Sequence, residues 1–333
     1  MDRARSVPSK NIPLAVLALS VSFLAILGIA APARASQLVD RNATDVHLQV
    51  NAKGQALIAY RASGRLRRVL GWGAINARPS ASGGTQVSFR LDYSGGWGTY
   101  HRRVWQTFAD TCHRYDGPVL THVVASCTAG DGSYWALQSW RVGLPDLGFL
   151  PWLRNQKVPW LTLSHWSGET AELEVHTDWV YGGRFQHVFG RLTYRGRPVY
   201  GYRTTRLGAP TDRFGRLLYL DTLDAPAYGH GWRRENSFVT HKGTGVFCYG
   251  FFRHDPTSGG YVAPPNWPRH HRRGPGVGKR YRVTVAGPGV TPDISWEGLG
   301  LHPYSPKNPA DVAYEQAQNA ILDSYGDRLC RQH

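Results

Sequence analysis

Three carboxylates and one imidazole alternate with other residue types in one short stretch of the chain. The stretch runs from Glu172 to Asp178 and reads Glu-Leu-Glu-Val-His-Thr-Asp. Because successive side chains of a β-strand point to opposite faces, we expect the even-numbered residues to form one row with a spacing of about 7 Å. Paired carboxylates, one ionised and one protonated, perform glycosidic hydrolysis. If the chain is an enzyme, its candidate catalytic residues are Glu172, Glu174, His176 and Asp178; the alternative is a solvated polar face of a half-buried strand.

This row resembles the Glu-x-Asp-x-(x)-Glu strand of laminarinase-type β-glucanases. The resemblance implies a secreted hydrolase with a concanavalin-like jelly-roll fold. The sequence departs from the family pattern in two places, because Glu174 stands where the family has aspartate and Asp178 lies one residue too far along. The likeness covers only this stretch of the chain.

Other chemistries have weaker signatures. His176 and Asp178 have the spacing that begins a two-histidine-one-carboxylate iron site, with His241 as the distant ligand and Arg253 to hold a co-substrate carboxylate. Such sites need reduced iron and 2-oxoglutarate, which are scarce outside the cell. The sequence contains no Gly-x-Ser-x-Gly elbow, His-Glu-x-x-His helix or phosphate-binding Gly-x-x-x-x-Gly-Lys loop. We therefore expect no metal and no cofactor.

A basic segment and tryptophans beside glycines point to binding rather than to chemistry. Residues 268–280 combine arginines and histidines with glycines and prolines, which suits a loop lying along an anionic polymer. A solvated connection is the alternative. Aromatic rings on loops stack on sugar faces, although buried rings merely fill a core. The candidate binding residues are Arg269, Arg272, Arg273, Arg280, Trp97 and Trp232.

The N-terminal segment predicts export. Basic residues precede an apolar run over 14–31, and Ala33-Arg34-Ala35 fits a signal-peptidase site. The mature protein should begin at Ser36 and work outside the cell or in the cell wall. A retained anchor is the alternative, because about 18 apolar residues approach the length needed to span a bilayer. No membrane span is expected once the leader is removed.

Charge and cysteines fit that location. The net charge of +16 suits an acidic partner. The four cysteines allow three pairings. We expect Cys112–Cys127, which closes a short loop, and Cys248–Cys330, which ties the tail to an apolar strand. A zinc site is the alternative, but the sequence has no Cys-x-x-Cys pair.

Period-two alternation dominates the chain and predicts a mainly β protein. The expected strands are residues 46–50, 56–60, 87–91, 119–127, 134–142, 171–179, 184–194, 198–205, 246–252 and 280–286. The expected fold is an antiparallel β-sandwich, jelly-roll or concanavalin-like, with a C-terminal α-helix. We divide it into a signal peptide (1–35), an N-terminal β region (36–143), a Pro- and aromatic-rich loop or linker (144–160) and a C-terminal β region (161–333). One continuous domain over 36–333 is the alternative.

The C-terminal helix is marked at both ends. Asn308 should cap it, Pro309 should take its first position, and Gly326 should end it. Its buried stripe should consist of Ala313, Ala317, Ala320, Ile321 and Ser324.

Residues 131–138, 231–238 and 327–333 resemble secreted actinobacterial proteins with no assigned function, and this likeness implies a shared fold but no activity. We therefore expect non-catalytic binding of a polysaccharide or anionic cell-envelope polymer. The alternatives are a glycoside hydrolase or lyase using the carboxylate row and a structural envelope protein without a ligand. No specific nucleic-acid partner is expected, and the oligomeric state is open.

Overall fold

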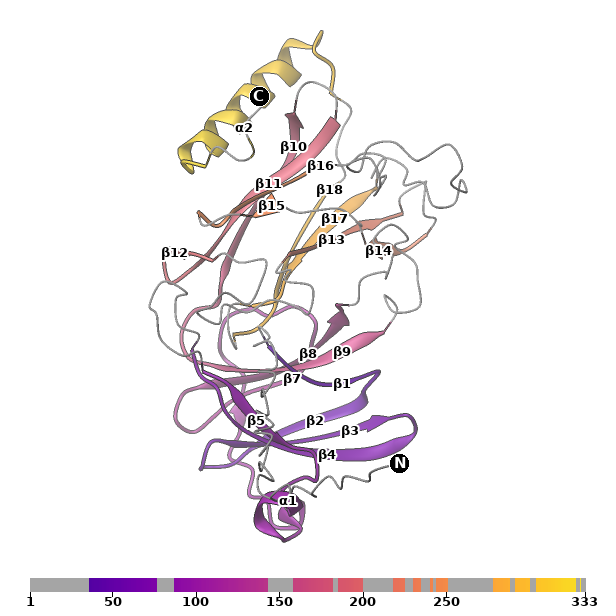
Figure 1. Cartoon of the computed structure of the whole chain (residues 1–333), viewed down its shortest axis with the longest axis vertical. Coiled ribbons are helices and arrows are strands. Elements are labelled where there is room, and N and C mark those ends of the chain that lie inside the picture. The colour runs from indigo at the N-terminus through magenta and orange to yellow at the C-terminus, as the bar shows by residue number, and fades with distance from the viewer. Residues whose placement is uncertain are drawn as a thin grey trace, which may run out of the picture. The chain divides into compact units, whose positions relative to one another are not determined.

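The protein is mainly β, with antiparallel sheets and one long C-terminal helix (Figure 1). The computed structural model describes residues 36–76, 87–142, 158–181, 185–199, 218–224, 230–234, 240–241, 244–250, 278–287, 291–299, 304–327 and 330. Within these residues, no helix is long and apolar enough to cross a membrane. The expected antiparallel fold with a C-terminal helix is confirmed.

Two sheets are built mainly from the first half of the chain. The first has the order β1 (Gln37–Arg41), β9 (Pro159–Trp166), β8 (Tyr134–Arg141), β7 (Val123–Thr128) and β6 (His113–Arg114). The second has the order β2 (Thr44–Val50), β3 (Gln55–Ala62), β4 (Arg65–Gly73) and β5 (Phe89–Asp92). Alternate side chains of both sheets meet in one buried cluster, which includes Ile58, Tyr60, Trp135, Leu137 and Leu163.

Two further sheets come from the second half. One has the order β10 (Glu172–Tyr181), β11 (Phe185–Tyr194), β16 (Val246–Gly250) and β15 (Thr240–His241), and β12 (Arg197–Pro198) also pairs with β11. The other has the order β14 (Trp232–Arg234), β13 (Leu218–Leu223), β17 (Arg280–Val285) and β18 (Ile294–Leu299). Their shared core also includes Trp140 and Trp160, which come from β8 and β9.

Some strands differ from the sequence expectation. The strand expected from residue 119 begins only at Val123, and Val119 is 94% exposed. His122, just before it, has a positive φ of 58°, which interrupts an extended backbone. β9 starts at Pro159, inside the expected loop, and pairs with β8 and β1. Most of that loop and residues 200–205 lie outside the described residues.

Helix α2 (Pro309–Ser324) begins as expected, because Asn308 Oδ1 accepts a hydrogen bond from Ala310 N at 3.1 Å. The expected buried stripe is wrong except at Ile321, which is partly buried against the helix's partner cluster. Four residues of that stripe are exposed, namely Ala313, Ala317, Ala320 and Ser324. The helix instead buries Gln318 and Leu322, because it packs beside β10 on a cluster that contains the large ring of Trp179. The side chains of Gln318 and Leu322 are larger than alanine or serine, and they fill the contact with this cluster.

The most buried carboxyl group among the described residues is that of Asp293, which lies just before β18 and is 1% exposed. Its carboxylate accepts hydrogen bonds from Ser36 Oγ at 2.8 Å, Trp140 Nε1 at 2.6 Å and Gly287 N at 3.0 Å. The Gln138 side chain bonds to both the backbone N–H and the backbone carbonyl of Asp293, each at 2.8 Å. Burial raises the pKa of this carboxyl group, and the hydrogen bonds oppose that effect. The network connects β8 and the start of β1 to β18.

Both expected disulfides are confirmed. Cys112 is bonded to Cys127, and Cys248 is bonded to Cys330. The first spans 15 residues, whereas the second spans 82 and fixes the tail beyond α2 to β16. The chain is therefore a disulfide-bonded β protein, a class typical of oxidising compartments.

We expect the longer loop to contribute more to stability. Replacing Cys248 and Cys330 with serine should lower the free energy of unfolding by roughly 4.5 kcal/mol, against roughly 3 kcal/mol for Cys112 and Cys127, because loop-closure entropy grows with loop length. Denaturant unfolding of the two double variants measures both values. An equal or larger loss from the shorter loop would contradict this expectation.

Candidate functional site

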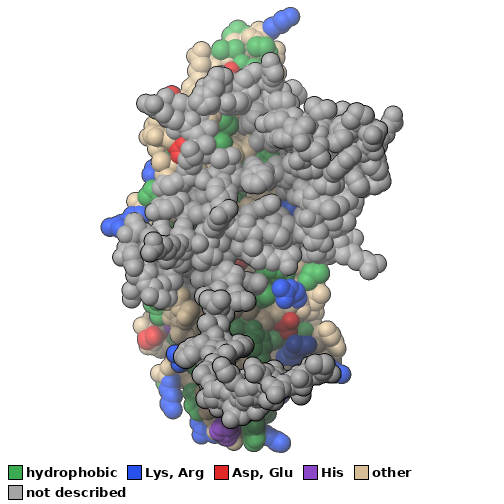
Figure 2. All heavy atoms as spheres, in the orientation of Figure 1, with side chains coloured by type: hydrophobic (Ala, Val, Ile, Leu, Met, Phe, Trp, Pro, Cys, Tyr) green, Lys and Arg blue, Asp and Glu red, His purple; other side chains and the backbone are tan. Residues whose placement is uncertain are grey.

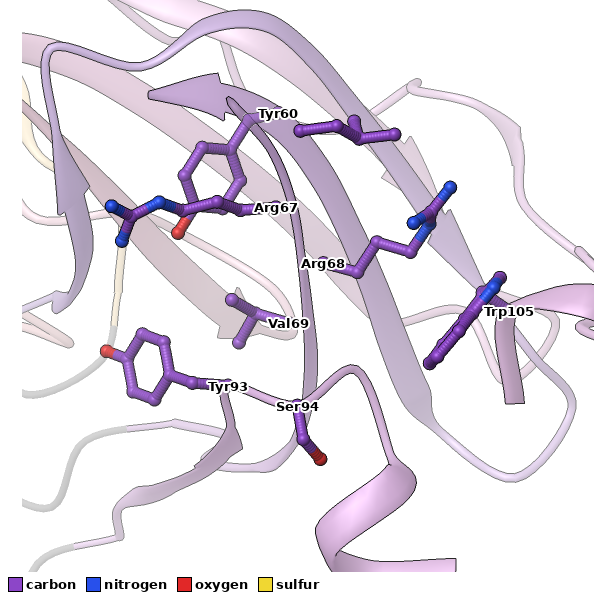
Figure 3. A pocket seen from close by; sticks show the side chains of 8 residues that line it. Tyr60, Arg67, Arg68, Val69, Tyr93, Ser94 and Trp105 are labelled. Atoms are coloured by element: carbon purple, nitrogen blue, oxygen red, sulfur yellow. The ribbon is translucent and has the colours of Figure 1, made fainter. Parts of the chain in front are cut away.

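A groove lies beside β4 and the loop that follows β5, with a volume of about 360 Å³. We call it the β4 groove. It is lined by Tyr60, Leu66, Arg67, Arg68, Val69, Tyr93, Ser94 and Trp105. Figure 3 shows the two arginine side chains extending to opposite sides of Val69, with Arg68 directed toward Trp105. Its volume is within the range of small-ligand sites, about 300–1,000 Å³.

The two arginines differ in their partners. Arg67 forms an ion pair with Asp40 at 3.2 Å, and Tyr60 donates a hydrogen bond to the same carboxylate at 2.9 Å. The guanidinium carbon of Arg68 lies 5.3 Å from the ring centroid of Trp105. Among the described residues, Arg68 has no carboxylate partner. The N–H groups of Arg68 can therefore bind an anion in the groove, while the indole ring of Trp105 holds the plane of the guanidinium group in place.

Exposed aromatic rings stand on the loop at the edge of the groove. Tyr93 is 58% exposed, and Trp97, the first residue of the short helix α1 (Trp97–Tyr100), is 50% exposed. Figure 2 shows basic side chains beside hydrophobic ones over the region of the N-terminal sheets. Exposed rings next to an arginine are suited to a sugar unit that carries a negative charge.

Asp92 fixes the shape of this loop. Its carboxylate accepts hydrogen bonds from Ser94 N at 2.9 Å, Thr99 N at 2.9 Å and Thr99 Oγ1 at 2.7 Å. Burial alone would raise the pKa of Asp92, but the hydrogen bonds from Ser94 and Thr99 hold it below its usual value. The carboxylate therefore stays ionised and keeps accepting these bonds at neutral pH.

Two glycines allow the loop to approach the groove. Gly95 has a φ of 68°, and a Cβ atom there would lie 3.0 Å from Cβ of Arg68 and 3.2 Å from the Trp105 ring. Gly96 has a φ of 97°, and its Cβ would lie 2.6 Å from a methyl group of Val104. A larger residue at Gly95 would displace Arg68 and Trp105 in the wall of the groove, and one at Gly96 would collide with Val104 behind the loop.

Two of the predicted binding residues lie on a different sheet. Trp232 of β14 and Arg280 of β17 both lie opposite Leu223 of β13. Their side chains therefore share one face of the sheet. The guanidinium of Arg282 lies 4.1 Å from the Trp232 ring centroid, and Arg280 pairs with Glu297 at 2.8 Å. The arginines on this face therefore have partners already. The other predicted binding residues, Arg269, Arg272 and Arg273, lie outside the described residues.

The expected carboxylate row is interrupted. A β-bulge shifts the register of β10 between His176 and Trp179, and Asp178 has a positive φ of 59°. The even alternation therefore ends at His176, and the expectation that Asp178 continues the row is wrong. Glu172 lies at the start of β10 and accepts a hydrogen bond from Thr193 Oγ1 at 3.2 Å.

Glu174 and His176 contact the C-terminal segment. His176 Nε2 lies 2.8 Å from Glu174 Oε1 and 3.1 Å from the Tyr325 hydroxyl, and its ring stacks on Phe189. Burial would raise the pKa of Glu174, but hydrogen bonds from His176 and Tyr325 lower it. A glycosidase acid needs the opposite shift, because it must be protonated to donate. The contacts connect β10 to the end of α2.

A serine and a histidine that the sequence analysis did not connect also meet. Ser295 Oγ lies 2.9 Å from His122 Nε2 and donates to Thr284 Oγ1 at 2.9 Å. Burial, followed by the charge of Arg282, lowers the pKa of His122 to about 4. Such an imidazole is a weak base at neutral pH and activates a hydroxyl poorly. The other iron-site residues named from the sequence, the His241 side chain and Arg253, lie outside the described residues.

We expect Asp92 to control the order of the loop at the groove. Asp92→Ala should speed hydrogen exchange at the Thr99 amide about tenfold or more, since that amide loses its acceptor. In the unchanged protein, the same protection should be present above the ordinary pKa of aspartate and be lost as the pH falls through the lowered pKa of Asp92. Asp116→Ala, which removes an exposed carboxylate elsewhere, is the control. Unchanged exchange at Thr99 would contradict the role of Asp92.

Comparisons of this chain with protein-family models, with curated proteins and with solved structures find no match.

Proposed function

We propose that the protein is exported and binds a polysaccharide whose sugar units carry carboxylate or phosphate groups, without changing it chemically. The observation that carries this proposal is Arg68, a cation in the wall of the β4 groove that stacks on Trp105 and has no carboxylate partner among the described residues. An anionic group of the polymer would take the N–H donors of Arg68 in charge-assisted hydrogen bonds.

The rest of the groove suits the uncharged part of such a polymer. The exposed ring of Tyr93 lines it, and Trp97 is exposed on the same loop. The apolar face of a sugar ring packs on such rings. The net charge of +16 favours encounter with an acidic partner, and the disulfides fit a protein that works outside the cytoplasm.

Binding fits the described residues better than hydrolysis does. The groove combines a free cation with exposed rings, whereas Glu174 and His176 contact Tyr325 and Phe189. We also predict that Arg269, Arg272 and Arg273 extend the same electrostatic attraction to the polymer.

Arg68→Ala should weaken binding about tenfold and lower the slope of log affinity against log salt by about one, because one ion contact is lost. The matched control is Arg65→Ala, an exposed arginine on the same strand that does not line the groove. Equilibrium binding is measured with polygalacturonate, phosphorylated dextran and neutral dextran. Equal losses in both variants would show that net charge alone drives binding. Failure to bind either acidic polymer, or equal binding to dextran, would overturn the proposal.

A further inference from the structure

Ser36 is the first residue after the expected cleavage point, and it is held inside the protein. It is 5% exposed, and its Oγ donates a hydrogen bond to Asp293 Oδ1 at 2.8 Å. Strand β1 begins at the next residue, where Gln37 lies opposite Leu163 of β9. Three covalent bonds separate the backbone nitrogen of Ser36 from its Oγ, a span of less than about 4 Å. The nitrogen therefore lies no more than about 7 Å from Asp293 Oδ1, within reach of its carboxylate.

The donors around Asp293 are all neutral. They are the hydroxyl groups of Ser36 and Thr162, the indole of Trp140 and the backbone N–H of Gly287. Among the described residues, no lysine, arginine or histidine pairs with this carboxylate. A buried carboxylate is costly unless a counter-ion or enough hydrogen bonds compensate for the lost water.

We propose that cleavage between Ala35 and Ser36 supplies this counter-ion, because the α-ammonium group that it creates forms a buried ion pair with Asp293. In the cleavage, water adds across the peptide bond, so that Ala35 leaves as a carboxylate and the nitrogen of Ser36 becomes an ammonium group. Before cleavage the same nitrogen is a neutral amide. Removal of the leader thus stabilises the folded chain, and the precursor is the less stable form.

The surroundings allow the pair to be tested by pH. The elements packed on Ser36 and Asp293 present the uncharged side chains of Gln138, Trp140 and Thr162. His122 stacks on Trp140, and its pKa of about 4 keeps it neutral above pH 7.

The test compares two exported proteins made from the full chain with its leader. One is unchanged, and the other has one alanine inserted before Ser36, which moves the α-ammonium group away from Asp293. Mass spectrometry locates both termini. At pH 7 the insertion should lower the folding equilibrium constant about tenfold or more, as breaking a buried pair does. An unchanged protein that does not begin at Ser36, or equal stabilities at pH 7, would overturn the proposal.

The pH dependence separates charge from crowding. Pairing raises the pKa of the α-amine in the folded protein, so its stabilisation is fully present below the unfolded pKa of about 8 and is lost as the pH rises through the folded value. The difference between the two proteins should therefore shrink between about pH 8 and pH 10. A difference that stays constant over this range would mean that the inserted alanine acts by steric strain, and the ion pair would be excluded.

Two further measurements do not depend on the insertion. Periodate oxidises an N-terminal serine whose amine and hydroxyl are both accessible, so the folded unchanged protein should resist oxidation and the unfolded protein should react. Rapid oxidation of the folded protein would overturn the proposal. In an Asp293→Asn background, the inserted alanine should no longer change stability; an undiminished effect would contradict the pair. None of these outcomes depends on polymer binding.

Discussion

The buried carboxylate of Asp293 is the constraint on which the arrangement of the strands depends. A carboxylate removed from water must have its oxygens hydrogen-bonded, and the donors must come from whatever packs around it. Here they come from Ser36, Trp140 and Gly287, far apart in the sequence. Gln138 adds both backbone groups of Asp293 to the same network. These requirements fix the positions of β8 and the start of β1 relative to β18.

This constraint joins the two hydrophobic cores. Trp140 donates its indole N–H to Asp293 and buries its ring in the core of the C-terminal sheets. Its neighbour on β8, Leu137, packs in the core of the N-terminal sheets. One strand therefore serves both cores, and the polar network sits between them. The β4 groove lies on the sheet of β2 to β5, which packs on this strand's sheet. Tyr60 and Val69 line the groove and also belong to the buried core beneath it.

Local patterns in the sequence predicted the features that depend on neighbours along the chain. The Cys112–Cys127 disulfide and the Asn308 cap follow from short-range spacing, and both are confirmed. The Cys248–Cys330 disulfide, which spans 82 residues, was expected from its strand context and is also confirmed. The buried stripe predicted for α2 was wrong at Ala313, Ala317, Ala320 and Ser324, because the partner surface decides which face of a helix is buried. The bulge in β10 was also missed, because period-two alternation carries no signal for the residue at which the register shifts.

The candidate site was predicted only in part. Trp97 was named from the sequence, and it directly follows the loop that lines the groove. Arg68 and Trp105 were not identified, because their contact joins residues that are distant in the sequence. Asp293 was missed for the same reason: a single aspartate before a strand resembles any turn residue until its burial is known.

Native-state hydrogen exchange in mild denaturant tests most directly whether the network makes the chain one cooperative unit. The amides of β3 lie in the N-terminal core and those of β17 in the C-terminal core. If the Asp293 network couples the cores, both sets should exchange with the same free energy and the same dependence on denaturant. Exchange of β17 at a lower free energy, with β3 still protected, would contradict this coupling and would show two units that unfold separately.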